Sequence, residues 1–140
     1  METTRERPAD IAVWRLYLLR ALYLLIAVGQ GSLQFPKIVH PVPGEFWHGV
    51  GVSFLAGLAL LCLIGLRYPL QMLPLLLYEF TWKTIWLLSV AVPRYLTHNL
   101  NADTADNIFD IGLGVVLCPI VIPWDYVYTN YIKRPGDRWK

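Results

Sequence analysis

Two residues of opposite charge, Glu79 and Lys83, stand four positions apart in the middle of a long apolar segment. A glutamate one helical turn before a lysine is the favourable order for an ion pair on one helix face. Tyr78, Trp82 and Trp86 recur around the pair at three- and four-residue spacings, so a helix would carry all five on one face. Indole rings can stack on an ammonium, hold a planar ligand or simply pack. This stripe predicts either a ligand or proton site or a pair that only fixes helix register.

Two further charges, Arg20 and Asp110, also lie in apolar segments. A charge at the centre of a bilayer costs about 2.5–3.5 kcal/mol on insertion scales, so each needs a partner or a function. At ~1.5 Å per residue, Arg20 and Glu79 lie at similar depths, about 10 and about 13 Å from one face. We expect Arg20 to pair with Glu79, and Lys83 to reach toward Asp110 near the outer end of its helix. These four charges sum to zero.

Both added residues also allow simpler interpretations. Arg20 can extend its guanidinium to the lipid headgroups. Asp110 can stabilise the positive end of a helix dipole. The intramembrane charges therefore predict either a neutral structural network or a ligand-binding one.

Residues that could bind a metal ion or haem are few. His40, His48 and His98 are predicted on one side of the membrane, but no HxxxH or HxxE spacing joins them. His48 is the preferred ligand, because it alone falls inside a predicted helix. The two cysteines, Cys62 and Cys118, form no CxxC motif, and we interpret them as small buried apolar residues.

The elements that must position these side chains follow from composition and run length. The 140-residue chain is 56% hydrophobic and 16% charged, against roughly a quarter charged in soluble proteins. A net charge of +2, without a basic cluster, argues against nucleic acid as a partner. Four apolar runs reach the ~20 residues that span a bilayer. They predict an all-α, four-helix transmembrane bundle in a single domain, 1–140, with helices at about 13–33, 46–66, 70–92 and 107–127.

The connections sharpen these bounds. Trp14, Arg15 and Arg20 interrupt the first run and no A-x-A-like site follows, so we expect a retained helix rather than a cleaved signal peptide. A tight hairpin is expected at 67–69. Prolines should end the first helix and bend the fourth; those residues are Pro36, Pro41 and Pro43, and then Pro119 and Pro123. Asp103 and Asp106 are candidate caps for the fourth helix.

The placement of lysine and arginine predicts the topology. Cytoplasmic segments of membrane proteins carry an excess of these residues. Here the two ends and the second connection carry Arg5, Arg7, Arg15, Arg67, Lys133, Arg134, Arg138 and Lys140. The opposite two loops carry only Lys37 and Arg94. Eight against two predicts that both termini are cytoplasmic.

A family resemblance rests on the first two-thirds of the chain. The segment Arg20-Ala-Leu-Tyr-Leu-Leu-Ile-Ala-Val-Gly29, the following Lys37, a glycine-rich second helix and the short Gly65-Leu-Arg67 turn resemble the DoxX-like four-helix proteins of bacterial inner membranes. The resemblance implies a four-helix architecture and the bacterial inner membrane as location. The stripe around Lys83 and the segment 119–124 depart from the pattern, so it implies little about function.

Three functions remain open on the sequence alone. In the first, Tyr78, Glu79, Trp82, Lys83 and Trp86, with Arg20 and Asp110, bind or transport a small amphipathic or zwitterionic molecule. In the second, the chain is a non-catalytic accessory or scaffold subunit of a larger membrane complex. In the third, it is a haem- or metal-binding redox protein that uses His48.

Two more expectations concern catalysis and partners. An enzyme is the least favoured class, because no nucleophile–base arrangement is legible. The partner is the lipid bilayer. A small residue at every fourth position, Gly49, Ser53 and Gly57, would also let another helix approach, within the bundle or in a homo-oligomer.

Overall fold

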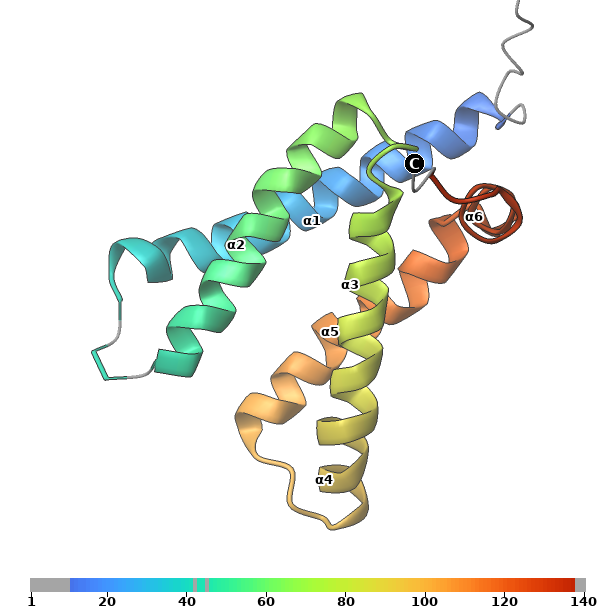
Figure 1. Ribbon diagram of the computed structural model, residues 1–140. Helices are drawn as coiled ribbons and strands as arrows, with labels where there is room; N and C mark the ends of the chain where they lie inside the picture. Colours follow the sequence, from blue (N-terminus) through green and yellow to red (C-terminus); the bar gives the residue numbers. More distant parts are fainter. Residues whose placement is uncertain (1–10, 42, 45, 138–140) are drawn as a thin grey trace, which may run out of the picture.

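The computed structural model describes residues 11–41, 43–44 and 46–137 and is helical throughout its regular elements (Figure 1). In chain order these are α1 (Val13–Val39), α2 (Phe46–Arg67), α3 (Leu73–Trp86), the π-helical turn η1 (Leu87–Ala91), α4 (Val92–Leu96), α5 (Ala102–Val121), α6 (Trp124–Val127) and the π-helical turn η2 (Tyr128–Lys133). Because α3, η1 and α4 follow one another without a break, they form one long helix, Leu73–Leu96.

The long helices form two hairpins. α1 packs against α2, and the helix from α3 to α4 packs against α5. α1 also contacts α5, and α2 contacts α3, which joins the hairpins. Figure 1 shows that they diverge from the α2–α3 connection, so the α1–α2 loop and the α4–α5 loop point apart. The buried apolar core lies near that connection and includes Leu19, Leu22, Tyr23, Ile26, Cys62, Leu73, Leu76 and Cys118.

All four long helices have the length and apolar composition needed to cross a membrane. They are Val13–Val39, Phe46–Arg67, Leu73–Leu96 and Ala102–Val121. At most 33% of the most apolar window of any of them is buried inside the protein. A bilayer would cover the remaining apolar side chains, so these helices indicate a multi-pass membrane protein.

The first and third helices differ from their predicted bounds. α1 continues through Pro36 to Val39, although this proline was expected to end it. A proline so near the end of a helix removes only one late hydrogen bond, and the His40 N–H still donates to the Pro36 carbonyl at 2.9 Å. α3 begins at Leu73 rather than residue 70, with Pro74 in its first turn, where no N–H donor is needed.

The fourth helix is displaced toward the N-terminus relative to the prediction. Asn101, not either aspartate, caps α5, and its side-chain oxygen accepts from the Thr104 N–H at 3.0 Å. Pro119 lies inside α5, but Pro123 ends it, because the residue before a proline is driven out of the helical region. Ile122 accordingly has φ −63° and ψ 125°. The displacement moves Asp110 from the predicted outer end of the helix to the middle of α5.

Candidate functional site

The Glu79–Lys83 pair is the centre of the site. Its charged atoms, Glu79 Oε1 and Lys83 Nζ, are 2.7 Å apart across one turn of α3. Glu79 is 1% exposed and Lys83 7%, so the pair is shielded from the surroundings of the protein. Trp82 holds the carboxylate from the other side, since its Nε1–H donates to Glu79 Oε2 at 2.7 Å. The Lys83 ammonium also lies 5.6 Å from the centre of the Trp82 ring.

A glycine on the neighbouring helix makes room for the lysine. Gly114 of α5 faces Lys83, and a β-carbon at this position would lie 2.8 Å from Lys83 Cδ. Real β-carbons do not approach a neighbour that closely, so any larger residue would displace the lysine side chain. The absence of a side chain at Gly114 therefore lets α5 approach the ion pair.

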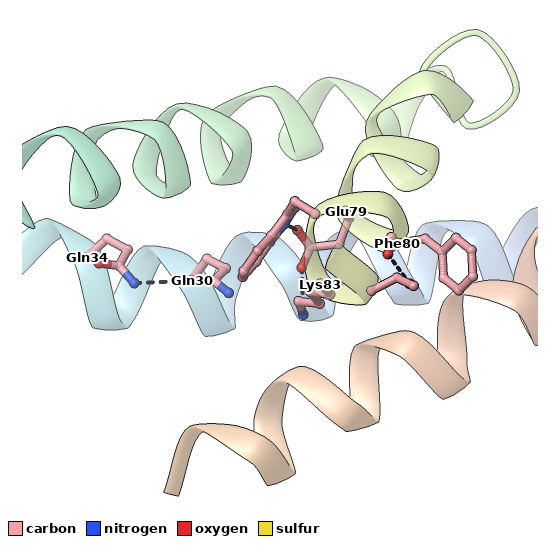
Figure 2. Close-up of polar contacts among 7 residues, drawn as sticks. Gln30, Gln34, Glu79, Phe80 and Lys83 are labelled. Atoms are coloured by element: carbon pink, nitrogen blue, oxygen red, sulfur yellow. Dashed lines mark hydrogen bonds and ion pairs between the residues drawn. The ribbon is translucent and has the colours of Figure 1, made fainter. Parts of the chain in front are cut away.

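A cavity of about 200 Å³ lies beside the pair, between α1, α3 and α5. Its polar lining consists of Glu79 and Lys83 from α3, Asp110 from α5 and Gln30 from α1. The apolar walls are formed by Leu22, Leu25, Ile26 and Leu33 of α1 and by Leu113, Leu117 and Cys118 of α5. Figure 2 shows Glu79 and Lys83 beside α1 and α5, with Gln30 and Gln34 on neighbouring turns of α1. We call this space the α1/α3/α5 cleft.

The structure brings together three of the seven predicted site residues, Glu79, Lys83 and Asp110, in the lining of this cleft. Trp82 joins them through its hydrogen bond to Glu79. Two other members of the stripe do not line the cleft: Tyr78 is 51% exposed, and Trp86 is partly buried elsewhere on α3. The stripe that was expected to share one helix face is therefore divided: some of its members line the cleft and others do not.

Arg20 does not form the expected pair with Glu79. Its Nε–H donates instead to the Leu66 carbonyl, 3.0 Å away at the end of α2, and its guanidinium lies 5.6 Å from the Tyr17 ring. A backbone carbonyl left open at a helix end is a natural acceptor for this donor. Arg20 therefore does not belong to the mutually neutralising group that was predicted with Glu79, Lys83 and Asp110.

Asp110 lies on the cleft without a partner. Its side chain is exposed, and it makes no hydrogen bond or ion pair with any residue in the described part of the chain. The expected Lys83–Asp110 contact is not formed, and the lysine pairs with Glu79 instead. Asp110 nevertheless stands one turn, about 6 Å along the axis, from Gly114, against which the ammonium lies.

Sequence reasoning missed Gln30 and Gly114. Gln30 accepts a hydrogen bond from the Gln34 amide at 3.2 Å, along one face of α1. Two glutamines four residues apart in an apolar helix are a signal that could have been noticed. No such signal marks Gly114, since its role depends on the lysine opposite it.

The histidines lie away from this cleft. His48 lines a smaller pocket between the ends of α1 and α2, beside Lys37 and Pro41, while His40 and His98 are exposed. Within the residues that the structure describes, no group of three or more His, Cys, Asp or Glu side chains could hold a metal ion. The metal or haem hypothesis on His48 thus gains no ligand set from this part of the chain.

Comparison of the chain with models of protein families, with curated proteins and with solved structures gives no match. The resemblance to DoxX-like proteins therefore stays a prediction.

Proposed function

We propose that this protein binds or transports a small amphipathic or zwitterionic molecule in the α1/α3/α5 cleft. The observation that carries the proposal is a buried Glu79–Lys83 pair beside a cavity with apolar walls. Ligand sites are typically apolar clefts with a few convergent polar groups. Ionisable residues in the middle of membrane-spanning helices are expensive and usually serve function.

The rim of the cleft supports entry from within the bilayer. Leu25 and Leu33 on α1 are 53% and 54% exposed, and Leu113 on α5 is 44% exposed. These side chains line the cleft and also face outward, so the apolar part of a ligand could enter between them. The buried charged pair, Glu79 and Lys83, lies deeper, on α3.

The polar groups have distinct roles in this proposal. The Lys83 ammonium has three N–H donors, and Glu79 is its one ion-pair partner among the described residues. It can therefore donate to a ligand while the pair stays intact. Trp82 keeps the Glu79 carboxylate oriented, and the Gln30 amide adds a neutral donor on the α1 wall.

A filling variant tests the cleft. Gly29 lines it from α1, and a β-carbon there would meet nothing within 4 Å, so Gly29→Leu should fill the space without a clash of its β-carbon. Gly51→Leu on α2 is the matched control, because Gly51 also has open space but lies outside the cleft. The protein would be placed in lipid nanodiscs and dialysed against three molecules with the same alkyl chain, hexyltrimethylammonium, hexanol and hexanesulfonate.

We expect at least one of these probes to bind, with affinity reduced about tenfold or more by Gly29→Leu and unchanged by Gly51→Leu. The proposal is overturned if no probe binds above the level of empty nanodiscs, or if the two variants behave alike. A chain that instead serves as a scaffold subunit would give that negative result.

We also propose that both termini are cytoplasmic and that the membrane is a bacterial inner membrane. The excess of lysine and arginine on the two ends and the second connection supports the orientation. The resemblance of the first two-thirds of the chain to DoxX-like proteins supports the location. Four of those residues, Arg5, Arg7, Arg138 and Lys140, lie outside the described residues. Reporter fusions at residue 140 and in the loop around His98 test the orientation. A cytoplasmic reporter should be active at the first site and silent at the second.

A further inference from the structure

The charges around the α1/α3/α5 cleft do not balance. It is lined by two carboxylates, Glu79 and Asp110, but by a single ammonium, Lys83. Glu79 and Lys83 neutralise each other at 2.7 Å. Asp110 is left over, on the cleft and near the middle of α5.

No other cation of the described chain compensates Asp110. Arg20 is engaged with the Leu66 carbonyl. Arg94 donates to the Thr104 hydroxyl at 2.7 Å and, more weakly, to Asn101 at 3.4 Å, and it does not line the cleft. The α1 wall contributes the neutral amide of Gln30 and no positive charge.

The uncompensated charge of Asp110 restricts the charge that a ligand of the cleft can carry. An anion would add to the uncompensated charge and would compete with Glu79 for Lys83. A zwitterion would leave the sum of charges at minus one. A monovalent cation would bring the cleft to neutrality, and its apolar body would lie against Leu22, Ile26 and Leu117, which line the same space.

We propose that the ligand of this cleft is an organic cation with an apolar body, for which Asp110 is the counter-ion. The inference rests on the proposed function and narrows it from amphipathic molecules in general to cationic ones. The Glu79–Lys83 pair then forms a neutral polar part of the cleft lining, while Asp110 makes the cleft prefer a positively charged ligand. An ion pair of this kind gains strength because the surroundings have a low dielectric constant.

The three hexyl probes test the choice of charge. Hexyltrimethylammonium should bind at least about tenfold more tightly than hexanol, and hexanesulfonate should bind most weakly. Asp110→Asn keeps the shape of the side chain and removes its charge, so it should abolish the preference for the cation while leaving hexanol binding unchanged. Asp110→Glu should restore most of that preference.

Asp106→Asn is the matched control, because Asp106 lies one turn earlier on α5, is exposed, and does not line the cleft. It should leave all three affinities unchanged. Size-exclusion profiles and thermal melting of each variant establish that it is folded.

The possible failures are distinguishable. If the probes bind and respond to Gly29→Leu, but the cation is not preferred or Asp110→Asn keeps the preference, the charge assignment is wrong and the cleft remains a binding site. If Asp106→Asn has the same effect as Asp110→Asn, general surface charge explains the preference, and the assignment to Asp110 is overturned. If Gly29→Leu and Gly51→Leu behave alike, both proposals fail.

Discussion

The two hairpins differ in the kind of side chain that each one encloses where its helices approach closely. In the α1–α2 hairpin, Tyr23 is fully buried against Gly65, and its hydroxyl donates to the Pro69 carbonyl at 2.9 Å. In the hairpin of α3 and α5, the close approach at Gly114 accommodates a charged lysine instead of an aromatic ring. The same device, a glycine opposite a large side chain, thus serves apolar packing in one hairpin and encloses an ion pair in the other.

Two basic residues, Arg20 of the first hairpin and Lys83 of the second, show the same contrast. Arg20 is satisfied by a backbone carbonyl and lies near an aromatic ring, at the edge of the core. Lys83 is buried and depends on the Glu79 carboxylate. A planar guanidinium with several donors can use scattered acceptors, whereas a compact ammonium needs one strong partner. The comparison predicts that the second hairpin is the more sensitive to loss of a charge.

The largest effect is expected at Glu79. Glu79→Ala would leave the Lys83 ammonium buried without its partner, and breaking a buried pair in this way costs about 3–5 kcal/mol. Unfolding in mixed micelles with increasing dodecyl sulfate would measure the loss.

The control replaces both partners at once. Glu79→Gln together with Lys83→Met removes the charges and keeps similar volumes, so most of the stability should return. A double variant as unstable as Glu79→Ala would mean that the pair itself, rather than the stranded charge, supports the hairpin.

A smaller effect is expected at Gly65. In Gly65→Ala the new β-carbon would lie 2.5 Å from Tyr23 Cδ1, so the ring or the helix must move, at a cost of about 1–3 kcal/mol typical of overpacking. Gly57→Ala on the same helix is the matched control, because nothing lies within 4 Å of its β-carbon. Equal melting temperatures for the two variants would contradict the packing described for the first hairpin.

The smallest effect is expected at the start of α5. Asn101→Ala removes the side-chain acceptor for the Thr104 N–H and should cost about 1 kcal/mol. Hydrogen exchange at the first turn of α5 would detect the local loss before global unfolding does. Asn99→Ala, just before the cap, should leave that exchange unchanged, because none of the described side-chain hydrogen bonds involves Asn99. Faster exchange in both variants would argue against a specific cap.

Much of the architecture could be predicted because it depends on local properties. Four helices follow from runs of apolar residues long enough to span a bilayer. The Glu79–Lys83 pair follows from a spacing of four within one helix. The helix bounds do not follow from the prolines alone, since the effect of a proline depends on its position in the helix. Pro36 is tolerated near the end of α1, while Pro123 ends α5.

The amino-acid sequence by itself determined the helices, the pair and the presence of surplus charges in apolar segments. Only the tertiary structure decided which of those charges meet. Arg20 donates a hydrogen bond to a backbone carbonyl of α2, and Asp110 lines a cleft together with Gln30 of α1. The physical reason is that such contacts depend on how helices cross. Crossing is set by close approaches such as those at Gly65 and Gly114, which no spacing along one helix encodes.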